Sequence, residues 1–192
     1  MSFVQASIFA LKKLPPAEQQ ATYGLRVLTT RFWLRAAGKR DIDIWMPDAG
    51  PSRDLLAAMR AGQLSDAEFL TRYEEEQRQA THCHIVCYVA GERVATRTLS
   101  CSPLAYLLQL GKRYGRVTIL CWEAEPLLCH RHRLLEVLQE GIKESANETT
   151  GSFCTRHSQR RAIVVMLGWK KVCLWCVIEH AQQRQPTLKH SC

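Results

Sequence analysis

The sequence predicts a single-domain α/β protein, with a mostly parallel central sheet flanked by helices and an inserted β-hairpin. Apolar, β-branched runs of strand length alternate with amphipathic segments of helix length. This succession favours parallel strands joined by helical crossovers. A chain of 192 residues, 46% of them hydrophobic, is also large enough for one buried core.

The first part of the chain indicates three strands. Residues 3–11 predict a strand that ends at the stiff turn of residues 12–16, where two prolines follow two lysines. Residues 25–30 and 41–45 predict the second and third strands from their apolar spacing.

Cap residues and turn residues define the next elements. Ser52 is placed to cap one helix, and Ser65 with Glu68 forms the capping box of another. Residues 85–98 predict a β-hairpin around an Ala-Gly-Glu turn. Pro103 then suits the first position of a further helix.

Residues 116–138 concentrate the reactive side chains of the chain. Residues 117–120 predict a buried strand, and Pro126 places the start of the following helix near Glu125. Ligands of open α/β sheets bind beyond the carboxyl ends of the strands, and Cys121 follows this strand directly. The sequence therefore predicts a functional site at this strand-to-helix junction.

The order of certain residues is similar to that of a known family. The residues concerned are Cys121-Trp122-Glu123, Cys129-His130-Arg131, and upstream Arg31 to Arg35, Pro51-Ser52, Phe69 and Tyr73. Between about Gly24 and Gly141 the chain resembles the domain of unknown function 488 family. The resemblance implies a compact α/β core domain over residues 23–141, which has an uncharacterised site. Residues 1–22 then form an N-terminal strand and turn, and residues 142–192 a basic tail.

Four side chains of the junction are the candidate catalytic residues: Cys121, Glu123, Cys129 and His130. A cysteine near a helix start is stabilised as a thiolate, so Cys129 or Cys121 is the candidate nucleophile, and Glu123 or His130 the candidate proton carrier. In the alternative interpretation, both cysteines are small buried hydrophobes beside a turn.

Three arginines are the candidate substrate-binding residues. Arg31 and Arg35 follow the second predicted strand, and Arg131 opens the helix after the central strand. Guanidinium groups bind carboxylate or phosphate with two parallel hydrogen bonds. The sequence thus indicates an enzyme acting on a small anionic or nucleotide-like substrate. Alternatively, Arg31 and Arg35 pair with aspartates in a surface loop.

Three groups of residues contain the side-chain types that bind metal ions. Cys121, Cys129 and His130 are suitable ligand types at an unusual spacing. Two weaker groups are His82, Cys83, His84 and Cys87, and Cys173 with Cys176 and His180, His190 or Cys192. The sequence therefore predicts no metal ligand, and it identifies no cofactor.

A non-catalytic nucleic-acid or ligand-binding module is the rival hypothesis. The net charge is +8, and residues 141–192 hold 8 lysines and arginines against 3 acidic residues. The basic and aromatic residues of this tail that suit nucleic acid are Arg156, Arg160, Arg161, Lys170, Lys171, Trp169 and Trp175. They match no reader motif, and the chain contains no P-loop, GxGxxG, HExxH or GxSxG pattern.

The expected location is the cytoplasm. The first residues have no signal-peptide pattern, and no run of about 18 apolar residues predicts a membrane span. The nine cysteines are then expected to be reduced thiols.

Overall fold

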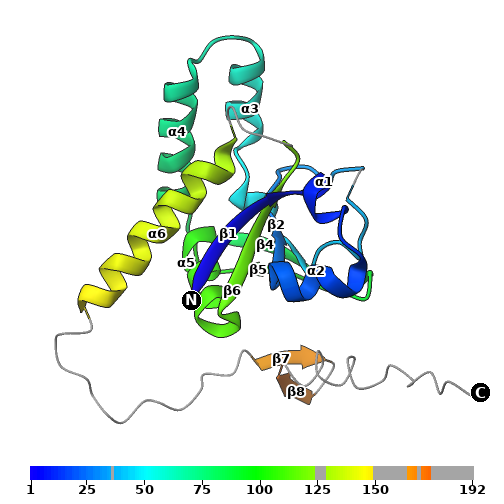
Figure 1. Cartoon of the computed structure of the whole chain (residues 1–192). Coiled ribbons are helices and arrows are strands. Elements are labelled where there is room, and N and C mark those ends of the chain that lie inside the picture. The colour runs from blue at the N-terminus through cyan, green and yellow to red at the C-terminus, as the bar shows by residue number, and fades with distance from the viewer. Residues whose placement is uncertain (36, 124–128, 149–163, 168–169, 174–192) are drawn as a thin grey trace, which may run out of the picture. The chain divides into compact units, whose positions relative to one another are not determined.

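The computed structural model describes residues 1–35, 37–123, 129–148, 164–167 and 170–173 (Figure 1). The chain divides into two units, Met1–Glu148 and Thr149–Cys192. In the second unit, β7 (Val164–Leu167) and β8 (Lys170–Cys173) form an antiparallel pair. Of the predicted tail, residues 142–148 belong to a helix of the first unit, and residues 149–163, 168–169 and 174–192, with Cys176, His180, His190 and Cys192, lie outside the described residues.

The first unit is built on a six-stranded sheet with the order β1-β6-β2-β3-β4-β5. Its strands are β1 (Ser2–Ser7), β2 (Leu25–Leu28), β3 (Ile44–Trp45), β4 (Cys83–Val89), β5 (Glu92–Leu99) and β6 (Arg116–Cys121). The prediction of a mostly parallel sheet was wrong, because the sheet is mixed. The pairings β1·β6, β6·β2 and β2·β3 are parallel, whereas β3·β4 and β4·β5 are antiparallel.

The predicted β-hairpin accounts for the mixed character of the sheet. Strands β4 and β5 are joined by a tight turn in which Ala90 and Gly91 both have positive φ. The hairpin adds to the sheet edge through the antiparallel pairing of β4 with β3. That this hairpin is an insertion stays a prediction.

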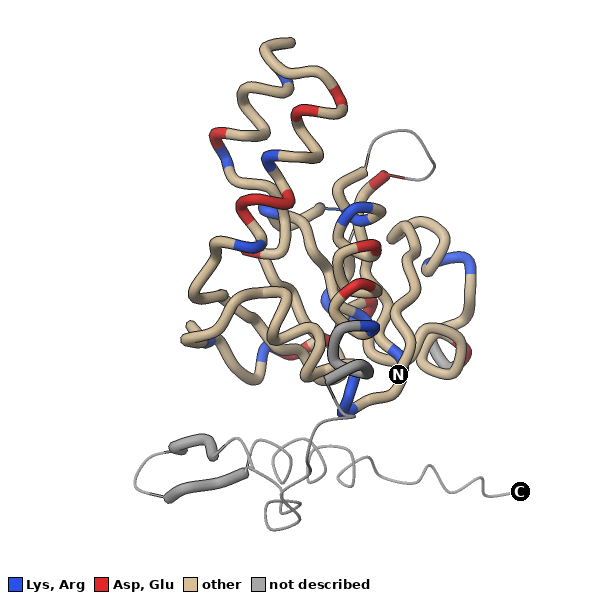
Figure 2. The backbone as a smooth tube through the Cα atoms, turned by 90° about the vertical axis from the view of Figure 1, so that its left-hand side faces the viewer, with Lys and Arg blue, Asp and Glu red and all other residues tan. Residues whose placement is uncertain are grey.

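Helices cover both faces of the sheet. Helices α1 (Ile8–Leu11) and α2 (Pro16–Tyr23) lie on one side, and α3 (Arg53–Arg60), α4 (Asp66–Gln79), α5 (Pro103–Tyr114) and α6 (His130–Glu148) lie on the other (Figure 1). A short 3₁₀ helix, η1 (Pro47–Ala49), follows β3. Basic and acidic residues are interspersed along the helices, as Figure 2 shows. Among the described segments, no helix combines the length and apolarity that a bilayer crossing requires.

Local sequence signals set several helix starts as predicted. The Ser52 side chain accepts a hydrogen bond from the Leu55 amide, and Ser65 with Glu68 forms the expected capping box. The first strand is shorter than predicted, because the Ser7 side chain caps α1 by accepting from the Ala10 amide. The predicted helix start at Glu125 and Pro126 lies outside the described residues.

Strand β6 separates two hydrophobic cores. Val117 and Ile119 pack with α5 and α6, whereas Leu120 packs with Ile8 and Leu11 of α1. Successive side chains of a strand point to opposite faces, which explains this division. Neighbouring strands β1 and β6 thus lead into helices on opposite faces of the sheet. A junction of this kind is where ligands bind in open α/β sheets.

Candidate functional site

Two thiols and one carboxylate meet where β6 ends and α6 begins. The Cys121 Sγ donates to Glu123 Oε2 at 2.6 Å, and the Cys129 Sγ donates to the same oxygen at 3.0 Å. Cys121 and Cys129 are only 1% and 3% exposed, while Glu123 reaches solvent. We call Cys121, Glu123, Cys129 and His130 the thiol cluster. The structure therefore brings all four candidate catalytic residues together.

The orientation of His130 is fixed by its neighbours. Its Nε2 lies 2.9 Å from the carbonyl oxygen of Thr29. A carbonyl oxygen only accepts, so Nε2 carries the hydrogen and, in the neutral ring, Nδ1 carries the lone pair. This Nδ1 lies 4.0 Å from the Cys121 Sγ. The ring of Tyr73 packs edge-on against the imidazole, with 5.3 Å between the centroids.

The two cysteines have opposite acid–base tendencies. The hydrogen bond from Cys121, aided by the hydrogen bond and charge of His130, lowers the pKa of Cys129 to about 6, although burial acts to raise it. The hydrogen bond to Cys129 and burial raise the pKa of Cys121 far above its ordinary value. Cys129 also directly precedes α6, where the positive end of the helix dipole favours a thiolate. The site thus favours one thiolate, at Cys129, beside one neutral thiol.

The charge state of Glu123 results from two opposing effects. Burial raises the pKa of this carboxyl, but the hydrogen bonds from Cys121 and Cys129 lower it by more. The net shift is downward, so Glu123 is a carboxylate at neutral pH and acts as an acceptor.

Arg131 is a buried cation next to the thiol cluster. Its side chain is 1% exposed, and its Nη1 donates to the backbone oxygen of Glu123 at 2.8 Å. Its Nε is buried and finds no hydrogen-bond partner among the described residues. Burying a charged donor without an acceptor costs free energy, and an anion would relieve that cost. Of the three candidate substrate-binding arginines, Arg131 is the one that the structure places at the thiol cluster.

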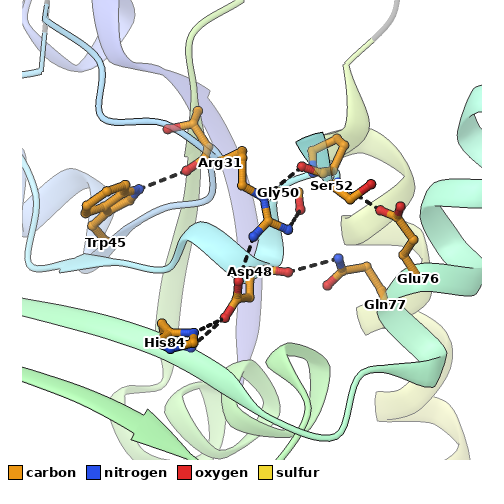
Figure 3. A network of polar contacts seen from close by, with 10 residues as sticks. Arg31, Trp45, Asp48, Gly50, Ser52, Glu76, Gln77 and His84 are labelled. Carbon is orange, nitrogen blue, oxygen red and sulfur yellow. Dashed lines mark hydrogen bonds and ion pairs between the residues drawn. The ribbon is translucent and has the colours of Figure 1, made fainter. Parts of the chain in front are cut away.

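Arg31 is occupied by contacts within the protein (Figure 3). Its Nη1 donates to Asp48 Oδ1 at 2.7 Å, and its other donors bond the backbone oxygens of Pro51 and Gly50 at 3.0 and 3.1 Å. Asp48 also accepts from the backbone and ring of His84. This is the aspartate pairing that the sequence left open. Arg35 is exposed and makes no hydrogen bond or ion pair within the described part of the chain.

Sequence reasoning missed the groups that orient His130. The Thr29 carbonyl is a backbone group, which leaves no signature in the sequence. Gly50 permits its backbone to pack closely against the backbone that carries the Thr29 carbonyl. An added Cβ at Gly50 would lie 2.8 Å from the Thr29 oxygen and 2.6 Å from the Arg31 backbone nitrogen. Tyr73, which donates to the Ala49 oxygen at 2.7 Å, carried a usable signal, because a buried tyrosine hydroxyl needs an acceptor.

The thiol cluster contains three potential metal ligands. Donor atoms of Cys121, Cys129 and His130 all lie within 4.8 Å of one another. Ligands of one zinc ion sit about 3.5–3.8 Å apart, from the usual bond lengths and tetrahedral angles. Glu123 Oε2 lies closer than this to both sulfurs, at hydrogen-bonding distances of 2.6 and 3.0 Å. The present geometry is that of a hydrogen-bonded cluster, and an ion would have to displace the carboxylate.

The weaker candidate ligands on β4 do not form such a group. Cys83 and Cys87 are buried, whereas His84 is exposed and pairs with Asp48. Alternation along the strand accounts for the separation of the histidine from its cysteine neighbours.

The fold and the site together define an α/β protein with a thiol and carboxylate cluster at the carboxyl end of a parallel strand. A profile of the DUF488-N3a family, described as the active DUF488-N3 subclade, matches residues 10–142. The chain belongs to this family, which confirms the resemblance to the domain of unknown function 488 family. The matched span includes the whole thiol cluster and all three candidate arginines. No curated protein and no solved structure matches the chain.

Proposed function

We propose that this protein is a cysteine-dependent enzyme in which Cys129 attacks an electrophilic carbon of a small anionic substrate. The observation that carries the proposal is the arrangement at the start of α6, where the Cys129 sulfur lies beside Glu123, His130 and a second thiol. A thiolate is the nucleophilic form of cysteine, and these neighbours favour it. The family description names an active subclade, which agrees with a reactive site.

Each member of the thiol cluster has a distinct role in the proposed reaction. Cys129 gives its proton to Nδ1 of His130, and its sulfur lone pair then forms a bond to the substrate carbon. The leaving group departs with its bonding pair and takes a proton from Nδ1 of protonated His130. Cys121 stays neutral and donates to the thiolate, and Glu123 accepts from the thiols before ionisation. Water then hydrolyses the adduct and restores Cys129.

In the proposed reaction one of the three candidate arginines binds the substrate, and the other two act without contacting it. Arg131, buried beside the cluster with an Nε that has no partner among the described residues, holds the anionic group of the substrate. Arg35 is exposed and contributes positive charge outside the cluster. Arg31, held by Asp48 and two backbone oxygens, acts as a positioning residue for the chain that carries Thr29.

The test is the pH dependence of alkylation by iodoacetamide, with each cysteine followed by peptide mass mapping. Cys129 is expected to react fastest, with a midpoint near pH 6. Cys87 is the internal control, because burial raises its pKa to about 11. In Cys121→Ala, which removes the thiol that donates to Cys129, the midpoint of Cys129 is expected to rise.

Two results would overturn the proposal. One is alkylation of Cys129 no faster than that of a cysteine in an unfolded peptide. The other is one equivalent of zinc in the purified protein that disappears in Cys129→Ser, because a bound ion would occupy the nucleophile.

A further inference from the structure

An exposed aromatic pair lies at the end of the two strands that flank the site. Phe9 follows β1 and Trp122 follows β6, and their rings pack edge to face with centroids 5.1 Å apart. Phe9 is 39% exposed and Trp122 is 46% exposed. In an edge-to-face pair each ring leaves at least one face uncovered by the other. Each ring therefore presents part of its apolar surface to solvent.

The topology of the sheet brings this pair to the same edge as the thiol cluster. Ser7 and Cys121 are paired in register at the carboxyl ends of β1 and β6. From this point β1 continues into α1 on one face of the sheet, while β6 leads to α6 on the other. Trp122 lies between Cys121 and Glu123 in the chain. The aromatic pair and the thiol cluster thus lie on either side of one strand end, at the position where α/β proteins bind ligands.

The other exposed aromatic near this edge is differently engaged. Phe32 follows β2, the next parallel strand, and the guanidinium carbon of Arg53 lies 5.2 Å from its ring centroid. That cation occupies one face of the Phe32 ring. The Phe9 and Trp122 pair is accordingly the better surface for a planar ligand.

We propose that Phe9 and Trp122 stack the base of a mononucleotide whose phosphate is held by Arg131, so that the substrate of the thiol cluster is a nucleotide. This inference rests on the proposed function and names its substrate class. An exposed aromatic face stacks any nucleobase, and a guanidinium binds phosphate through parallel hydrogen bonds. The Nε of buried Arg131, which has no partner in the described part of the chain, is the independent sign that an anion belongs at this edge.

The experiment compares ligands that carry one or both parts of a nucleotide. Binding of the four ribonucleoside 5′-monophosphates, of ribose 5-phosphate and of adenosine is measured by calorimetry on the full chain. At least one nucleotide is expected to bind more tightly than either partial ligand. Trp122→Ala is expected to weaken nucleotide binding about tenfold or more and to leave ribose 5-phosphate binding unchanged.

Two further variants control for indirect effects. Trp122→Phe keeps an aromatic face and is expected to retain most of the nucleotide affinity. Tyr114→Ala removes an exposed aromatic from the opposite end of β6, where α5 ends, and is expected to change nothing. The proposal is overturned if ribose 5-phosphate binds as tightly as every nucleotide, or if Trp122→Ala and Tyr114→Ala behave alike.

The failure of this inference is distinguishable from that of the proposed function. If Cys129 is alkylated fast but nucleotides bind no more tightly than the partial ligands, the nucleotide assignment is wrong and Cys129 is still supported as the nucleophile. A single-stranded oligonucleotide tests whether the recognised nucleotide is a free mononucleotide or part of a nucleic-acid strand. Trp122-dependent binding of the oligonucleotide, with none of any mononucleotide, would place the recognised base in a strand and overturn the mononucleotide assignment.

Discussion

Replacing Glu123 with glutamine tests the electrostatics of the thiol cluster directly. Glu123 Oε2 lies 3.0 Å from the Cys129 sulfur, and its negative charge acts to raise the pKa of Cys129. The substitution removes that charge and retains a side chain of the same size. The pKa of Cys129 is therefore expected to fall below its present value of about 6.

The size of the shift follows from the distance and from the solvent at the carboxylate. Two unit charges 3.0 Å apart interact by about 1.4 kcal/mol in a medium with the dielectric constant of water. Glu123 is partly desolvated but reaches solvent, so this screened value sets the minimum size of the shift. It corresponds to a fall of about one unit in the pKa of Cys129. The nucleophilicity of a thiolate decreases with its pKa, so the limiting alkylation rate should fall about threefold.

The assay is the alkylation profile of Cys129 between pH 4 and pH 8, with thermal unfolding as a check on folding. Glu136→Gln is the matched control, because Glu136 pairs with Arg133 on the exposed side of α6. In the control the midpoint should stay near 6. A midpoint that rises or does not move in Glu123→Gln would refute the electrostatic reasoning.

Three predictions concern the structure behind His130. Gly50→Ala places a Cβ against the Thr29 oxygen and is expected to lower the free energy of unfolding, measured with denaturant, by about 1–3 kcal/mol. An unchanged unfolding midpoint would show that the backbone moves to accommodate the Cβ without cost. Tyr73→Phe leaves the Ala49 oxygen unpaired in the core and should cost about 1–3 kcal/mol, which urea unfolding measures and a stability equal to that of the parent would contradict. Burial raises the pKa of Asp48, but hydrogen bonds from His84 and Arg31 lower it to a value below 3.8. The ionised Asp48 therefore stabilises the fold above pH 3.8, and this stabilisation is lost as the pH falls through the pKa of the folded state. Asp48→Asn should therefore be less stable at pH 7 and lose less stability on acidification, and parallel stability curves for the two proteins would exclude this linkage.

The parts of the fold that the sequence predicted correctly are those set by neighbours in the chain. The capping box at Ser65 and Glu68 spans three residues and appears as expected. The direction in which the β4–β5 hairpin joins the sheet depends on β3, nearly 40 residues upstream, so the mixed sheet had no local signal. The end of β1 was also wrong, since alternation of apolar residues could not show that Ser7 caps a helix.

The same distinction holds for the site. The thiol cluster was predictable because its members lie within ten residues around one strand end. The contact between Arg31 and Asp48 joins residues 17 apart, and the sequence offered it only as an alternative to anion binding. The acceptor of His130 is a carbonyl 101 residues away, which no residue type identifies.

A continuous set of contacts connects the Arg31 network to the thiol cluster. Asp48 holds the guanidinium of Arg31, and that side chain also binds the oxygens on either side of the Gly50–Pro51 bond. The backbone of Thr29 and Arg31 is packed so closely on Gly50 that no Cβ fits between them. Thr29 then accepts from Nε2 of His130, which fixes the tautomer and leaves Nδ1 facing the thiols. An arginine that first suggests anion binding thus acts on the chemistry through position, because it holds the backbone of Gly50 and Pro51, which packs against the carbonyl that determines which nitrogen of His130 faces the Cys121 sulfur.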